Sequence, residues 1–309
     1  MKDVTVLINC RNGAKYLQKT FSSLKAQSYK NFKVLFVDNR SSDDSINIVS
    51  KFENDIEIRV LQTPYPMTLG AARAYGVEFI DTNYFTILDT DDIYLENTLQ
   101  LLYDEIRCND FAVVYGHQLL INEQDDIIGR IMNRYAGTSG DFFEKLLWHW
   151  DIPIVGVIVS TTKIRERKIN FDEIYLGSEE FDFFLRVSAF YPFKAINNVV
   201  VKYRVHPSLS SSLGDRRELE RRMALENLQK LFPNYALQYA KAFQYAFAKC
   251  DYYKSLRFIE KKEFVNARRA IAGRLFYDWR YFAFYLATFL PKFCILLLRL
   301  KYKNQLNLS

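Results

Sequence analysis

The first half of the sequence alternates between two spacings of hydrophobic residues. Compact apolar runs have the length of buried strands, and the segments between them carry apolar residues every three or four positions, as on one face of a helix. The strand-like runs are 4–8, 33–37, 56–61, 84–88 and 111–116. The helix-like segments lie around 17–24, 46–52, 69–80 and 99–106. Apolar strands alternating with helices are typical of a parallel sheet covered on both faces, so we predict an α/β fold.

Polar residues follow three of these strands directly. The first strand runs into the turn Asn9–Asn12, the second ends at Asp38, and the fourth runs into "LDTDD", which contains Asp89, Asp91 and Asp92. In open α/β sheets, ligands bind beyond the carboxyl ends of the strands. We therefore expect these three polar groups to meet at one edge of the sheet.

The Asp89-Thr90-Asp91 sequence indicates a cation. Side chains two residues apart in extended backbone point the same way, and two converging carboxylates repel unless a cation lies between them. Hard oxygen ligands favour Mg²⁺ or Mn²⁺, which commonly bridge a carboxylate and a substrate diphosphate. For Asp92 we predict a different role, capping the helix that contains Leu99 and Leu102.

Two common phosphate-binding loops are absent. Gly13 is the only glycine between the first strand and Leu24, so the sequence has no GxGxxG turn. The GxxxxGK[ST] motif is missing as well. A nucleotide would then be held by side chains and a metal ion, with Asp38 accepting a ribose hydroxyl or a base N–H. The net charge of +6 is too small to indicate nucleic acid binding.

Cysteine usage and the N-terminus favour a cytoplasmic protein. The cysteines form no CxxC pair and no regular series, which suggests reduced thiols. They are Cys10, Cys108, Cys250 and Cys294. The sequence "MKDVTVLINC" leads straight into a strand, and we expect no signal peptide.

Five segments, in order, resemble the motifs of family 2 glycosyltransferases, which have the GT-A fold. They are "VTVLINCRNG" with "DNRSSDDS", "LGAARAYG", "ILDTDDIYLENTL", "SEEFDFFLRV" and "VVVKYRVHPSLSSS". The resemblance extends over residues 3–212. It implies an inverting transferase that moves a sugar from a nucleotide-sugar donor to a hydroxyl of a glycan or lipid-linked acceptor. We expect the donor to be UDP-linked. Many members of the family act on envelope glycans at the membrane.

The resemblance also implies roles for individual residues. Asp38 would contact the base, Asp89 the ribose or the metal, and Arg73 the donor, unless Arg73 is buried against a sheet carboxylate. The full set implied to bind the donor is Asn9, Cys10, Arg11, Asn12, Asp38, Arg73, Asp89 and Thr90. The divalent metal, Mg²⁺ or Mn²⁺, would be bound by Asp91, Asp89 and His206.

Glu180 lies where the family has its catalytic base. Glu179 and Asp182 are the alternatives. Two departures from the family pattern stand out: Ala74 replaces an asparagine, and Glu180 replaces the more frequent aspartate. His117 and His149 match no motif and are predicted to be structural. Trp148 and Trp150 either stack on an acceptor sugar or pack in the core.

Two other functions fit parts of the pattern. "FTILDTDD" also resembles the Asp-x-Asp strand end of haloacid-dehalogenase phosphatases, in which the first aspartate is the nucleophile. That family has this motif near the start of its fold, whereas here two strand–helix units precede it. The other alternative is a non-catalytic sugar-binding or scaffold relative.

After residue 212 the sequence becomes basic and its apolar spacing is that of helices. We predict a catalytic domain at 1–212, with a nucleotide-sugar half at about 1–115 and an acceptor half at about 116–212, followed by a helical, basic region at 213–309. Two helices are expected at 236–259 and 262–276.

The apolar segment 281–300 is interrupted by Pro291, Lys292 and Arg299. We predict an interfacial helix on an anionic membrane surface, involving 274–303, at the cytoplasmic face. A buried helix and a membrane span are the alternatives.

Overall fold

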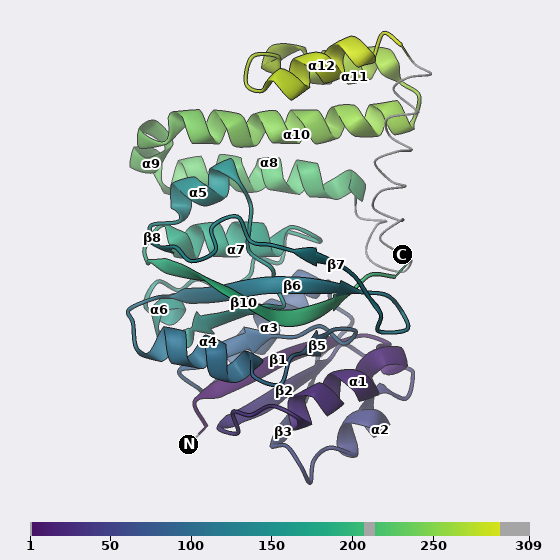
Figure 1. Cartoon of the computed structure of the whole chain (residues 1–309), viewed down its shortest axis with the longest axis vertical. Coiled ribbons are helices and arrows are strands. Elements are labelled where there is room, and N and C mark those ends of the chain that lie inside the picture. The colour runs from purple at the N-terminus through teal and green to yellow at the C-terminus, as the bar shows by residue number, and fades with distance from the viewer. Residues whose placement is uncertain (1, 207–213, 291–309) are drawn as a thin grey trace. The chain divides into compact units, whose positions relative to one another are not determined.

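The computed structural model describes residues 2–206 and 214–290 (Figure 1). The chain divides into two compact units, Met1–Leu209 and Ser210–Ser309. Among the described residues, all strands belong to the first unit, and the second unit contains helices. The predicted domain boundary after residue 212 lies outside the described residues.

The first unit begins with a four-stranded parallel sheet, as predicted. Its strands are β1 (Val4–Cys10), β2 (Phe32–Asp38), β3 (Ile58–Gln62) and β4 (Tyr84–Ile87). They lie in the order β3-β2-β1-β4, and each neighbouring pair is parallel. Because β1 and β2 end level, with Cys10 opposite Asp38, the polar residues that follow them share one edge of the sheet.

Helices cover both faces of this sheet (Figure 1). They are α1 (Ala14–Lys25), α2 (Ser45–Ser50) and α3 (Leu69–Glu78). The face that includes Val6 and Ile8 packs with apolar residues of α1 and α2. The other face packs on α3, where Gly76 lies so close that an added Cβ would be 2.7 Å from Leu7 Cδ1. Alternating side chains of one strand thus serve two different layers, which is why the strands are apolar throughout.

Beyond β4 the sheet is mixed. The other strands are β5 (Ile93–Tyr94), β6 (Val113–Ile121), β7 (Ile127–Ile131), β8 (Ser139–Gly140), β9 (Val157–Ser160) and β10 (Phe193–Arg204). Strand β9 is antiparallel to both β4 and β6, and β6 is parallel to β10. The α/β prediction is therefore confirmed, but the parallel arrangement is limited to the first four strands and the β6–β10 pair.

The other helices of the first unit are α4 (Thr98–Arg107), α5 (Phe143–Trp148), α6 (Thr161–Glu166) and α7 (Glu179–Ser188). The predicted capping role of Asp92 is wrong. Strand β5 separates Asp92 from α4, whose N-cap residue is Asn97, and Asp92 is buried. Helix α2 has Asp44 at its N-cap, and the preceding Asp43 accepts the Ser45 N–H.

The second unit is a helical bundle (Figure 1). Its elements are α8 (Gly214–Leu231), α9 (Pro233–Gln238), α10 (Ala240–Glu260), α11 (Phe264–Ile271), a 3₁₀ turn (Ala272–Arg274) and α12 (Trp279–Ala287). Lys262, with φ of 61°, turns the chain between α10 and α11, as expected for a helical hairpin. Small apolar clusters hold α12 against α10 and α11.

The predicted interfacial segment 281–300 is described only as far as Leu290, and 291–300 lies outside the described residues. Among residues 2–206 and 214–290, no helix has both the length and the hydrophobicity required to cross a bilayer. The described cysteines, Cys10, Cys108 and Cys250, are free thiols.

Candidate functional site

Asp38 is held at the end of β2 by two hydrogen bonds. Its Oδ1 accepts the Ser41 N–H at 3.1 Å, and its Oδ2 accepts the Gln62 side-chain amide at 3.1 Å. The residue is 1% exposed. Each carboxylate oxygen can accept a second hydrogen bond, so Asp38 is oriented and still able to receive a ligand N–H or O–H.

The turn after β1 is tied to the turn after β2. Asn12 adopts a φ of 56°, and its Oδ1 accepts the Ser42 N–H at 2.8 Å. Arg11 is exposed, whereas Cys10 is buried, and burial raises the pKa of its thiol. Asn9 is buried, and neither polar atom of its amide has a protein partner. An unsatisfied buried amide at this edge is suited to a polar ligand.

Arg73 joins two acidic segments that are far apart in the sequence. This buried side chain of α3 donates to Asp89 Oδ1 at 3.0 Å through Nη2 and to Glu179 Oε1 at 2.5 Å through Nη1. The alternative that Arg73 is buried against a carboxylate is therefore confirmed, and its contact with the donor stays a prediction. Glu179 Oε2 has no protein partner.

Asp91 pairs with His206. His206 Nε2 lies 2.7 Å from Asp91 Oδ2, although the two residues are 115 positions apart. Burial, and next the negative charge of Asp89, raise the pKa of the Asp91 carboxyl, and the contact with His206 opposes that shift. Thr90 lies between the two aspartates, and its backbone carbonyl accepts the Thr20 hydroxyl at 2.9 Å.

The three predicted metal ligands are not brought together as a single cluster. Within residues 2–206 and 214–290, no group of three or more His, Cys, Asp or Glu side chains is arranged to hold a metal ion. Asp89 contacts Arg73, so Asp91 and His206 are the two predicted ligands that lie side by side. A protein carboxylate suits Mg²⁺ or Mn²⁺ when substrate phosphates and water complete the coordination, so this pair fits a metal that is shared with a diphosphate.

The three candidate bases lie in the first turn of α7 and differ in environment. Glu179 is 1% exposed and bound to Arg73. Asp182 is 2% exposed and accepts Arg186 Nε at 2.8 Å, and burial raises the pKa of its carboxyl. Glu180 is the one member of the three that is not buried.

Arg204 was not among the predicted site residues. It is fully buried at the end of β10, where its backbone N–H donates to Asp92 Oδ1 at 2.8 Å and its Nε to the Asp91 carbonyl at 2.8 Å. The guanidinium also binds the Asn122 carbonyl at 2.7 Å and Asp125 at 2.5 Å. The Tyr-Arg-x-His segment contained the signal, but sequence reasoning selected only its histidine.

The structure also shows the surroundings of Trp148, Trp150 and His117. Trp150 packs against Phe181, with ring centroids 5.0 Å apart, which favours core packing. Trp148 donates its indole N–H to Glu144. His117 is buried and accepts the Asn133 N–H through Nδ1, and burial lowers the pKa of its imidazole, in keeping with a structural role.

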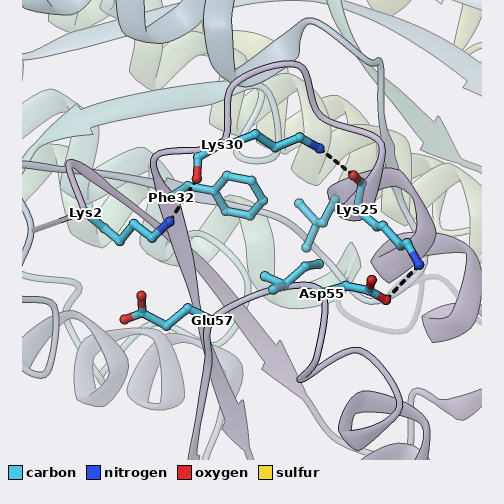
Figure 2. Close-up of a pocket in the computed structure, with 8 residues that line it drawn as sticks. Lys2, Lys25, Lys30, Phe32, Asp55 and Glu57 are labelled. Atoms are coloured by element: carbon cyan, nitrogen blue, oxygen red, sulfur yellow. Dashed lines mark hydrogen bonds and ion pairs between the residues drawn. The ribbon is translucent and has the colours of Figure 1, made fainter.

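A pocket lies elsewhere on the first unit (Figure 2). Its lining residues are Lys2, Leu24, Lys25, Lys30, Phe32, Asp55, Ile56 and Glu57. Lys2 and Phe32 precede or begin the first two strands, so this pocket is at the amino ends of the strands. It is therefore on the opposite edge of the sheet from Asp38 and Asp91, and its lysines are occupied by Asp55 and by backbone carbonyls.

Comparisons with known proteins show the family to which the chain belongs. The profile of "Glycosyl transferase family 2" matches residues 5–171, more than half of the chain. An uncharacterized glycosyltransferase of Haemophilus influenzae is 23% identical over 240 residues, which cover 73% of each chain. The Escherichia coli protein WfgD, a UDP-Glc:alpha-D-GlcNAc-diphosphoundecaprenol beta-1,3-glucosyltransferase, is 24% identical over 211 residues, which cover 68% of this chain and 79% of WfgD.

Solved structures share the fold. Residues 1–349 of Staphylococcus aureus TarS align with a TM-score of 0.64 and 15% sequence identity, covering 95% of this chain and 88% of that one. The complex of the same fragment with UDP-GlcNAc aligns with a TM-score of 0.60 and 16% identity, covering 88% of this chain and 91% of that one. The profile match ends before Glu180 and His206, so their roles depend on the geometry described above. With an enzyme family matched over most of the first unit, the phosphatase and scaffold alternatives fall away, and the chain belongs to glycosyl transferase family 2 as a glycosyltransferase of GT-A fold.

Proposed function

We propose that the protein transfers a sugar from a UDP-linked donor to a hydroxyl of a glycan or lipid-linked saccharide, with inversion at the anomeric carbon. The observation that carries this proposal is the Asp91–His206 pair at the same edge of the sheet as Asp38. The names of two similar proteins support the substrate class. WfgD is named for a UDP-Glc donor and a diphosphoundecaprenol acceptor, and TarS was solved with UDP-GlcNAc.

Each end of the donor has a suitable group at this edge. Asp38 accepts an N–H of the base or a hydroxyl of the ribose, and the buried amide of Asn9 offers both a donor and an acceptor nearby on β1. Asp91 and His206 would hold the divalent cation. Such an ion supplies a Lewis acid that offsets the negative charge that develops on the leaving diphosphate.

Glu180 is proposed as the general base. It accepts the proton of the acceptor hydroxyl while that oxygen forms the new bond to the anomeric carbon and the bond from that carbon to the diphosphate breaks. A single base acting opposite the leaving group gives inversion. The neighbouring carboxylates support this assignment, because Glu179 is engaged by Arg73 and Asp182 by Arg186, while Glu180 is partly exposed.

A donor screen tests this function. The purified chain is incubated with UDP-, GDP- and dTDP-sugars in the presence of Mn²⁺, Mg²⁺ or EDTA, and nucleotide release is measured. We expect UDP release that requires a divalent cation and is lost in Asp91→Ala. Release of GDP or dTDP instead would show that the donor carries a different nucleotide. Undiminished turnover in EDTA would overturn the proposed metal requirement. The anomeric configuration of a transferred product, read by NMR, tests inversion.

A further inference from the structure

The last described helix, α12, presents apolar side chains on two opposite faces. One face, with Tyr281, Phe284 and Ala287, packs in the small clusters shared with α10 and α11. The other face is exposed over successive helical turns. Its residues, with those that flank the helix, are Phe276, Trp279, Phe282, Leu286, Phe289 and Leu290, and we refer to this set as the aromatic stripe.

The exposure of this stripe is large for apolar side chains. Phe276 is 97% exposed, Trp279 78% and Leu290 61%. Trp279, Phe282 and Leu286 are spaced by three and four residues, so they lie along a single line on the helix surface. A helix that is apolar on both sides requires a second partner, and contiguous exposed apolar patches mark sites of interaction.

The charge of this part of the sequence favours an anionic partner. Residues 261–309 contain ten Lys or Arg and two Asp or Glu, a net charge of +8, of which the described residues 261–290 contribute +4, whereas the whole chain has a net charge of +6. The rest of the chain is therefore slightly acidic, and the positive charge is concentrated in this region. Lys262 and Arg269 are exposed, and Arg268 lies over the ring of Phe289, with its Cζ 4.5 Å from the ring centroid.

The positive charge of the described residues 261–290, which is +4, argues against self-association through the stripe, because two like surfaces would repel. Aromatic side chains beside basic residues instead match the boundary between lipid headgroups and acyl chains, where Trp and Tyr are enriched. We propose that the aromatic stripe of α12 lies in the surface of an anionic lipid bilayer, parallel to its plane, with Lys262 and Arg269 at the headgroups. This proposal is independent of the transferase reaction.

Vesicle sedimentation of the full chain tests this proposal without any sugar nucleotide. Two vesicle compositions are compared, phosphatidylcholine alone and equal parts phosphatidylcholine and phosphatidylglycerol. We expect the protein to sediment with the anionic vesicles, and high salt to weaken this binding. Trp279 fluorescence should shift to shorter wavelength on binding and be quenched by brominated lipids, and this part of the signal should be missing in Trp279→Phe.

Two variants separate the apolar and charged contributions. Phe282→Ser combined with Leu286→Ser should weaken binding at least about tenfold, because two apolar side chains no longer leave water. Lys262→Gln and Arg269→Gln should each weaken binding to anionic vesicles about fivefold. Leu237→Ser is the matched control for the stripe, since Leu237 is 81% exposed on α9 and outside the stripe, and it should bind like the unaltered chain.

Several results would overturn the proposal. They are no sedimentation of the unaltered chain, equal binding to neutral vesicles, and unchanged binding of the stripe variant. A dimer of the unaltered chain that the stripe variant converts to monomers, with no vesicle binding, would assign the stripe to a second copy. A stripe variant that unfolds by circular dichroism, while the two charge variants fold and bind normally, would assign the stripe to packing within the chain.

Discussion

Two short segments of the first unit each contain three acidic residues, and the fold uses the members of both sets in a similar way. After β4 these are Asp89, Asp91 and Asp92, and in the first turn of α7 they are Glu179, Glu180 and Asp182. One member of each set is bound by the same arginine, Arg73, and one is buried against another part of the backbone or its own helix. The third members are Asp91 and Glu180, for which we propose roles in the reaction.

The difference lies in what accompanies that remaining member. Asp91 lies beside the imidazole of His206, which suits a shared cation. Glu180 is partly exposed at the start of a helix, which suits proton transfer. We therefore propose a metal-binding role for Asp91 and a base role for Glu180, and this proposed division follows from neighbours that are distant in the sequence.

Removing the proposed metal ligand Asp91 should have the largest effect on activity. Asp91→Ala should nearly abolish transfer, by about 10³-fold or more, because the leaving diphosphate loses several kcal/mol of charge stabilisation. The measurement is nucleotide release over a range of Mn²⁺ concentrations. Asp110→Asn is the matched control, since Asp110 forms an exposed pair with Lys163 and should retain full activity. Activity restored to Asp91→Ala by excess Mn²⁺ would reduce Asp91 to one of several ligands.

Glu180→Gln tests the base side and should lower kcat by roughly 10²–10⁴-fold. Donor binding should be intact, because the substitution keeps the size of the side chain and leaves Asp38 and Asp91 in place. Calorimetric titration with UDP measures the binding, and stopped assays measure kcat. Retained turnover would transfer the role to Glu179 or Asp182, and Glu53→Gln, at an exposed glutamate, controls for the loss of one charge.

Glu179→Gln tests the link between the two sets. The variant leaves the buried Arg73 guanidinium with Asp89 as its one carboxylate partner, and breaking a buried ion pair costs about 3 kcal/mol. Urea unfolding should show a lower midpoint with an unchanged slope. Asp110→Asn, which removes the ion pair that the exposed Asp110 forms with Lys163, should cost less than about 1 kcal/mol. Equal stability of the two variants would show that the Arg73 pair does not support the site.

The smallest expected effect is the pH dependence of metal binding. Because burial and the charge of Asp89 raise the pKa of Asp91, this carboxyl stays protonated to a higher pH than an exposed aspartate. Protons compete with the cation, so the Mn²⁺ concentration for half-maximal activity should rise severalfold as the pH falls from neutral towards that pKa. In His206→Gln, which loses the contact that opposes the shift, the rise should begin at a higher pH. A pH-independent Mn²⁺ requirement would contradict the assignment.

Much of the fold could be predicted because its signals are local. The first four strands and the helices between them follow from apolar spacing, and the polar residues at the strand ends follow from chain order. The failures have tertiary causes. Asp92 looked like a helix cap until β5 separated it from α4, and Arg204 looked unremarkable until its burial beneath the Asp91–Asp92 segment was apparent.

The sequence by itself determined the fold class, the family motifs and the edge of the sheet where the polar residues gather, since strand periodicity and strand ends are properties of short segments. Only the tertiary structure decided which acidic residue meets which partner. Arg73 meets Glu179 across 106 positions, and His206 meets Asp91 across 115. Contacts at such separation arise when the sheet and its helices pack, and burial and charge at those contacts set the environment of each carboxylate.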